Sequence, residues 1–305
     1  VVRLLADGSL DSSFATVGWR TIDLLAGEDV VNGLVVLSDG RLRLCGHGWA
    51  VPLPASPDLV VYGLMADGAI ETSFGTGGVV LVDFFGGDEF GGACVAGGGD
   101  SVLVPGQSWV GAGGFDAVLA RVLVEGTLDP TFDDGSTGLP GRASLTIGGQ
   151  DEGCDAVVRQ ADGAMLCAIG SSATDGADSL LARFLPTGVL DPTFGTGGWV
   201  AFNLGGVDFF RAVTELPDDR IVAAGTRTND VGDQDFSLAV LTSSGALDPH
   251  AGTNVGRPGL FSFDITPGYD DEARSLALDA EGRLLVSGGT SDGGTNSFAI
   301  LRLLL

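Results

Sequence analysis

The sequence predicts an all-β protein, a β-propeller of five four-stranded blades of about 60 residues each. A nine-residue motif, in its clearest form LDPTFGTGG (190–198), recurs along the 305-residue chain. Its acidic residue returns at steps of 60, 58, 62 and 57 residues, at Asp11, Glu71, Asp129, Asp191 and Asp248. Between the motifs lie short apolar segments bounded by Gly, Asp and Pro, without a helical period. We therefore expect residues 1–305 to form a single β-propeller domain.

Each repeat is expected to supply four strands in the same order. The first two form an inner hairpin around a tight turn such as SDG (38–40), ADG (161–163) or AEG (280–282), where Gly accepts positive φ. A variable polar loop, a third strand, the motif and an outer strand follow. The inner hairpins are expected near 30–46, 91–107, 154–170, 210–226 and 273–289. The outer strands are expected near 18–24, 78–84, 142–147, 198–204 and 259–264.

The two ends of the array differ from the repeats between them. The last hairpin has no outer strand after it, so we expect residues 18–24 to complete that blade and cover its edge. Segments of the third-strand type occur six times, because both Val1–Leu5 and 297–305 have this character. This excess indicates further repeats or domains in a longer chain.

The motif itself is interpreted as structural. Its acid can accept backbone N–H bonds within the turn, and its glycines let the chain reverse. The four motif phenylalanines are expected to fill the crevices between blades, each contributing ~1.5–3 kcal/mol when buried; they are Phe14, Phe74, Phe132 and Phe194. A phosphate-binding loop is excluded for GTGG, because neither a Lys nor a helix follows.

The motif, the Asp-Gly hairpin turn and the period resemble those of the delta-60 repeat family of bacterial propeller-like proteins. The resemblance covers essentially the whole chain and implies a surface or secreted bacterial protein, without catalytic residues to transfer. One copy, GALDPHAG (245–252), departs from the pattern because His250 replaces the Phe.

The composition limits the classes of partner that the protein can bind. Fifteen basic residues stand against 40 acidic ones, a net charge of −25 that disfavours nucleic acid and anionic membrane surfaces. No apolar run reaches the ~20 residues that span a bilayer, so membrane insertion is not expected. The four cysteines lack metal-type spacing and are interpreted as buried free thiols. Cys154 and Cys167 share one hairpin, but the turn does not place them opposite each other, so their pairing is left open.

One face of the propeller is expected to carry the acidic loops that lead into the inner strands, together with the variable loops. These acids are either solvated edge charges that keep the sheets soluble or a rim that attracts cations. As a cation site they favour Ca²⁺, with the loop GYDDE (268–272) as the strongest candidate. The predicted ligands are Asp270, Asp271, Glu272, Asp88, Glu89, Asp151 and Glu152.

His47, Trp49 and Trp109 are the candidate ligand-binding residues of the variable loops. A Trp in such a loop either covers the core or forms a platform for a sugar ring. A lone His is more often an ordinary surface residue.

The inner strands lack the trio of carboxylates that a propeller glycosidase needs, since Glu215 alone clearly breaks their apolar pattern and Asp279 ends a strand. We therefore predict a non-catalytic binding or scaffold propeller, extracellular or at the bacterial cell surface, with a protein or glycan ligand. The alternative is a glycosidase-like enzyme with its acids on the rim.

Overall fold

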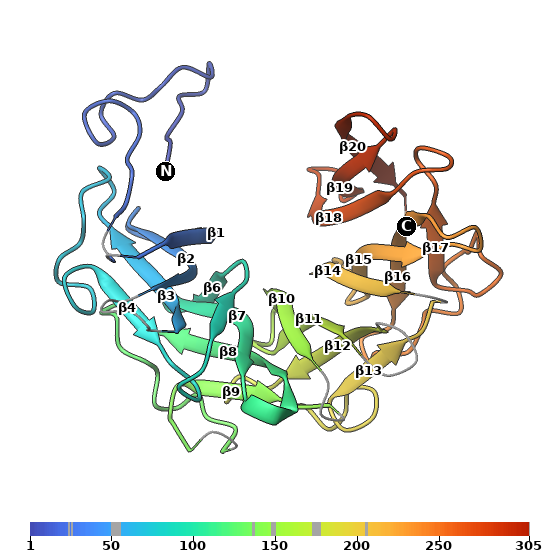
Figure 1. The fold of residues 1–305 in the computed structure, drawn as a ribbon, viewed down its shortest axis with the longest axis horizontal. Coiled ribbons are helices and arrows are strands. Elements are labelled where there is room, and N and C mark those ends of the chain that lie inside the picture. The colour runs from blue at the N-terminus through green and yellow to red at the C-terminus, as the bar shows by residue number, and fades with distance from the viewer. Residues whose placement is uncertain are drawn as a thin grey trace. The chain divides into compact units, whose positions relative to one another are not determined.

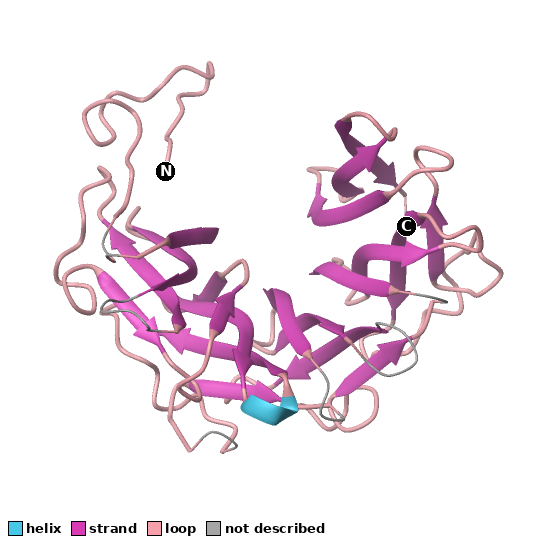
Figure 2. Ribbon diagram, viewed as in Figure 1, coloured by secondary structure: helices cyan, strands magenta, loops and turns pink. Residues whose placement is uncertain are grey.

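The structure is a computed structural model. It describes residues 1–23, 25, 27–49, 56–135, 138–147, 151–172, 178–204 and 207–304. Apart from the 3₁₀ helix η1 (Gly111–Gly113), the regular structure of these residues is β-strand (Figure 2). The strands form five sheets, so the predicted all-β propeller fold is confirmed (Figure 1). Within the described ranges, no helix is long and apolar enough to cross a membrane.

The chain divides into two compact units, residues 1–112 with 118–144, and residues 113–117 with 145–305. The first unit holds an antiparallel sheet of order β1-β2-β3-β4. Its strands are β1 (Asp29–Val36), β2 (Leu42–Trp49), β3 (Pro57–Leu64) and β4 (Val79–Val82). The second sheet has the order β5-β7-β8-β9, with β6 also paired to β7. Its strands are β5 (Glu89–Gly91), β6 (Val95–Gly98), β7 (Ser101–Trp109), β8 (Phe115–Val122) and β9 (Arg142–Leu145).

The second unit holds the three remaining sheets. The third sheet consists of β10 (Glu152–Arg159), β11 (Met165–Ser171), β12 (Asp178–Phe184) and β13 (Trp199–Phe202). The fourth consists of β14 (Asp208–Glu215), β15 (Ile221–Thr228), β16 (Gln234–Leu241) and β17 (Leu260–Phe263). The fifth consists of β18 (Asp271–Leu278), β19 (Leu284–Ser291) and β20 (Asn296–Leu303). All five predicted inner hairpins are present.

The prediction that residues 18–24 complete the last blade is wrong. Trp19 pairs with Val2, and the Arg3 N–H donates to the Gly18 carbonyl at 2.9 Å. The first residues therefore act as the third strand for this outer strand, as in every other repeat. In the described residues the sheet β18-β19-β20 keeps three strands.

The cores lie between successive sheets. In the first unit Leu59 and Val61 of β3 pack with Val102 and Val104 of β7. In the second unit one cluster joins the third and fourth sheets, and another joins the fourth and fifth. Most residues of β3, β7 and β16 are buried, as expected for strands covered on both faces.

The motif holds neighbouring repeats together, as predicted. Its four phenylalanines are at most 1% exposed, and an Arg guanidinium lies 4.0–4.9 Å from the centre of each ring. In one copy the Asp191 carboxylate accepts the Thr193 N–H at 2.9 Å and the Arg183 Nε–H at 2.7 Å. The Phe194 ring packs on Gly245 in the turn of the next repeat, 2.9 Å from where a Cβ would stand. His250, which replaces the Phe in the last copy, is exposed.

The cysteines differ from the expected free thiols, because they form two disulfides. Cys45 of β2 is bonded to Cys94, which follows β5, so this bond links the first two sheets. Cys154 of β10 is bonded to Cys167 of β11 within one hairpin. Their Cα atoms are 5.8 Å apart in both pairs, an ordinary spacing for a disulfide. Residues 45 and 94 are distant in sequence, so spacing along the chain could not reveal their pairing.

Candidate functional site

Every inner strand begins with an acid, and most of these acids are buried. They are Asp29, Glu89, Glu152, Asp208 and Asp271, the first residues of β1, β5, β10, β14 and β18. The last four are 0% exposed. The alternative of solvated edge charges is therefore wrong for these four positions. The residues just before three of them, Asp88, Asp151 and Asp270, are exposed, which fits both alternatives.

The buried acids bond to the backbone at the end of the preceding outer strand. Asp271 accepts the Ile265 and Thr266 N–H groups at 2.7 and 2.9 Å. Asp208 accepts the Leu204 N–H at 2.5 Å, and Glu152 the Ile147 N–H at 3.4 Å. We call each place where an outer strand leads to the next inner strand a junction, and the acid that begins the inner strand its junction acid. Junction acids thus have a structural role.

The loop GYDDE does not bring its acids to one point. The Asp270 carboxylate accepts the Gln234 N–H at 3.0 Å, and Glu272 forms an ion pair with Arg274. Asp271 is turned to the backbone of the preceding strand, as described above. Calcium binding by this loop remains a prediction.

Trp49 and Trp109 hold equivalent positions at the ends of β2 and β7. Their backbone N–H groups donate to the backbone carbonyls of Glu28 and Asp88, at 3.1 and 2.8 Å. Both residues therefore lie at the end of the sheets where the acidic loops lie, as predicted. Trp49 is half-buried, and Trp109 is 43% exposed.

His47 is half-buried and belongs to an aromatic cluster, so its interpretation as an ordinary surface residue is wrong. Its ring centre lies 5.7 Å from that of Trp49 and 5.1 Å from that of Phe90 on β5, both edge to face. Burial, its largest influence, lowers the pKa of His47, while the nearby charge of Glu28 opposes this. Neutral His47, Trp49 and Phe90 therefore form one aromatic surface across the first two sheets of the first unit.

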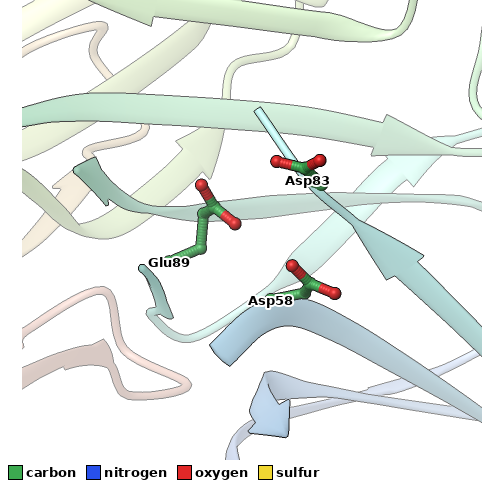
Figure 3. Close-up of side chains that lie close together, drawn as sticks. All are labelled: Asp58, Asp83 and Glu89. Carbon is green, nitrogen blue, oxygen red and sulfur yellow. The ribbon is translucent and has the colours of Figure 1, made fainter. Parts of the chain in front are cut away.

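Three carboxyl groups meet at the first junction, between β4 and β5. Asp58 is the second residue of β3, Asp83 follows β4 directly, and Glu89 begins β5. One oxygen of each lies within 4.8 Å of the others, and Figure 3 shows the three groups gathered around one point. Asp83 is exposed, Asp58 half-buried and Glu89 buried. Glu89 was among the ligands predicted from the sequence, whereas Asp58 and Asp83 were not.

Electrostatics at this junction oppose full ionisation. Burial raises the pKa of Glu89 to about 7, and the charges of Asp83 and Asp58 add to the rise, whereas bonds from Ser108 and the Phe84 backbone oppose it. Burial also raises the pKa of Asp58, and the charge of Asp83 adds to the rise, whereas a hydrogen bond with Glu89 opposes it. The trio therefore favours either a bound proton or a cation.

The same positions recur at the other junctions with different residues. The third-strand acid recurs in sequence as Asp58, Asp116, Asp178 and Asp235. The residue after the outer strand is Asp83, Thr146, Asn203 or Asp264 in turn. At the second junction the Thr146 hydroxyl donates to Asp116 at 2.7 Å. At the fourth, Asn229 and Ser262 donate to Asp235, both at 2.9 Å. At these junctions a hydroxyl or amide group thus donates to the third-strand acid, although Asp116 Oδ1 stays buried without a partner among the described residues.

The fifth sheet carries a groove of about 820 Å³. It is lined by Asp270, Glu272, Arg274 and residues of β19 and β20. Phe298, on its wall, is 99% exposed. The groove combines polar and apolar groups without a cluster of catalytic type.

The chain resembles a protein family described as "Domain of unknown function (DUF5122) beta-propeller" over residues 1–14, 100–132, 160–194 and 216–250. These segments make up less than half of the chain, and each ends at the motif Phe or at His250. The similarity supports a β-propeller repeat family. No curated protein matches the chain.

Among solved structures, a protein of unknown function from Dyadobacter fermentans has a TM-score of 0.56 at 12% identity, with 88% of this chain and 74% of that chain covered. A family PL25 ulvan lyase, bound to -[GlcA(1-4)Rha3S]-, has a TM-score of 0.54 at 12% identity. This match covers 89% of the present chain and 64% of the lyase. An endo-arabinase from Bacteroides thetaiotaomicron has a TM-score of 0.46 at 14% identity, with 91% and 95% covered. At such identities these similarities show the fold alone.

Proposed function

We propose that the protein is a non-catalytic carbohydrate-binding propeller of a bacterial cell-surface or secreted protein. The observation that carries this proposal is the aromatic surface of His47, Trp49 and Phe90, with Trp109 at the equivalent place on the next sheet. Aromatic faces pack against the apolar faces of sugar rings, while nearby polar groups bond to the hydroxyls. Here Glu28 and Asp88 are bonded through their backbone carbonyls to the backbone of the two tryptophans, so polar groups lie close to the proposed surface.

The proposed location rests on two features. Two disulfides are typical of oxidising compartments outside the cytoplasm. The motif also resembles the delta-60 repeat, which implies a surface or secreted bacterial protein. The net charge of −25 makes nucleic acid an unfavourable partner.

The alternative is a carbohydrate-active enzyme that uses Asp58, Asp83 and Glu89. The raised pKa of Glu89 would suit a general acid, and the ulvan lyase shows that a similar fold can act on a polysaccharide. Two observations favour binding instead. Glu89 is 0% exposed, so a sugar cannot reach it without rearrangement. The three acids also converge on one point, whereas the two carboxyl groups of a glycosidase stand on either side of the bond that they cleave.

A glycan array, run beside a screen for glycosidase and lyase activity, tests the proposal. The wild type is compared with Trp49→Ala and Trp109→Ala, and with Trp19→Ala as control, because Trp19 is 48% exposed and Trp109 43%. We expect at least one array glycan to bind the wild type and Trp19→Ala but not the two loop variants, with unchanged melting temperatures. Turnover that Glu89→Gln abolishes would favour the enzyme. Loss of binding by Trp19→Ala as well would contradict the assignment of the surface.

A further inference from the structure

We propose that Asp58, Asp83 and Glu89 bind one divalent cation, Ca²⁺, at the first junction. The site differs from the loop GYDDE, and it does not depend on the proposed carbohydrate ligand. It combines one acid from each of three separate elements, the start of β3, the end of β4 and the start of β5.

The spacing of the carboxyl oxygens suits this ion. Ca²⁺ binds oxygen at ~2.3–2.6 Å, so two oxygens on one ion are separated by no more than ~5 Å. One oxygen from each of the three acids lies within 4.8 Å of the others. In Figure 3 the three side chains approach the same point from different directions, which leaves that point surrounded by oxygen.

Glu89 supplies a second observation that points to a ligand. The residue is 0% exposed, and its Oε1 accepts the Ser108 hydroxyl at 2.6 Å. Its Oε2 is buried and has no hydrogen-bond partner among the described residues. The two neighbouring carboxyl groups have no proton to donate to Glu89 when they are ionised. A buried unsatisfied carboxylate oxygen is costly, and a cation would remove that cost.

Arg142 does not neutralise the three acids. The charges of Asp83 and Glu89 act on the Arg142 guanidinium, but within the described residues no ion pair joins Arg142 to these acids. Its guanidinium lies 5.9 Å from the Phe84 ring centre, and its Nη1 donates to the Pro140 carbonyl at 3.3 Å.

The other junctions show what a cation would replace. The position of Asp83 holds Thr146 at the second junction, where its hydroxyl supplies the proton that Asp116 accepts. At the first junction this position holds Asp83, whose carboxylate accepts hydrogen bonds instead of donating one. Asp83 is exposed, which gives an ion access from solvent and leaves room for water ligands.

Calorimetric titration of Ca²⁺ into EDTA-treated protein at pH 8 tests the site, because Glu89 is mostly ionised there. The variant is Asp83→Asn, whose exposed position makes misfolding improbable, and the control is Asp264→Asn, the same position at the fourth junction and also exposed. We expect one Ca²⁺ per chain in the wild type and in the control, and an affinity at least ~10-fold lower in Asp83→Asn. The melting temperature should rise with Ca²⁺ in the wild type and the control.

Three outcomes would overturn the proposal. The first is that Asp83→Asn binds Ca²⁺ as tightly as the wild type. The second is that Asp264→Asn loses binding equally. The third is that the wild type binds no Ca²⁺ and instead gains melting temperature between pH 8 and pH 6, which would assign a shared proton to the trio.

Discussion

At one end of the strands the repeated acids face arginines, and at the other end they face backbone or further acids. The motif acid Asp191 pairs with Arg183 and bonds to Thr193. Burial, its largest influence, raises the pKa of Asp191, but the Thr193 bonds and the Arg183 charge outweigh it, so the pKa is lowered overall. Burial raises the pKa of the junction acids Glu89 and Glu152 to about 7, without an ion pair to compensate.

This difference separates two uses of one repeat. The charged motif aspartates stabilise the fold at neutral pH, because their lowered pKa means that the folded protein holds the negative charge more easily than the unfolded chain; they are Asp11, Asp129, Asp191 and Asp248. The junction acids Glu89 and Glu152 are destabilising when charged, so they depend on a proton, on hydrogen-bond donors or on a cation. The first junction, which has three acids, is where this dependence is greatest.

The largest expected effect is at the motif end. Phe194→Ala should lower the free energy of unfolding by ~3–5 kcal/mol, because a ring that is 0% exposed leaves a cavity under Arg183. Urea unfolding of this variant is compared with that of Phe298→Ala, whose ring is 99% exposed and should be nearly neutral. Equal midpoints for the two variants would contradict the view that the motif Phe holds neighbouring repeats together.

The junction end should give stability a distinctive dependence on pH. The folded-state pKa of Glu89 is raised from 4.5 to about 7, so the folded protein binds more protons between these values. The resulting stabilisation is complete below about pH 4.5 and is lost as the pH rises through 7; for this shift it is at most ~3 kcal/mol. Glu152 should add a similar contribution.

Urea midpoints measured between pH 5 and pH 8 in EDTA test this dependence. Glu89→Gln should make the profile shallower, because the amide cannot be ionised and only the contribution of Glu152 remains. A wild-type stability that rises with pH across this window would show that the junction acids are not buried as described.

A motif acid should respond in the opposite direction. Asp191→Asn should cost ~1.5–3 kcal/mol at pH 7, since it removes a charge-assisted bond from Arg183 but leaves an acceptor for Thr193. The lowered pKa means that the wild-type advantage is present above about 3.8 and is lost as the pH falls further. Thermal melts at pH 7 and pH 3 measure it, with the exposed Asp230→Asn as control. A cost that persists undiminished at pH 3 would exclude the charge as its cause.

The smallest effect is expected at the altered copy of the motif. His250→Phe should be neutral or stabilise the protein by up to ~1 kcal/mol, because it restores the motif Phe in place of an exposed histidine. A lower melting temperature for His250→Phe would show that this repeat cannot accept the Phe.

The repeat was sufficient to predict the fold, because its information is local. Strand order, the inner hairpins and the burial of Phe14, Phe74, Phe132 and Phe194 follow from turn chemistry and spacing that recur in each copy. The place of Trp49 and Trp109 beside the acidic loops could also be predicted, since both follow from the same strand order.

The tertiary structure alone decided three features. These are the burial of Glu89 and Glu152, the disulfide between Cys45 and Cys94, and the close approach of Glu89 to Asp58 and Asp83. An acid before an apolar strand looks the same in sequence whether it is solvated or turned inward. Only the packing of one sheet on the next removes it from water. The recurring third-strand acids at 58, 116, 178 and 235 were a visible signal. Their partners lie on other strands, however, and only strand pairing and sheet packing bring those strands together.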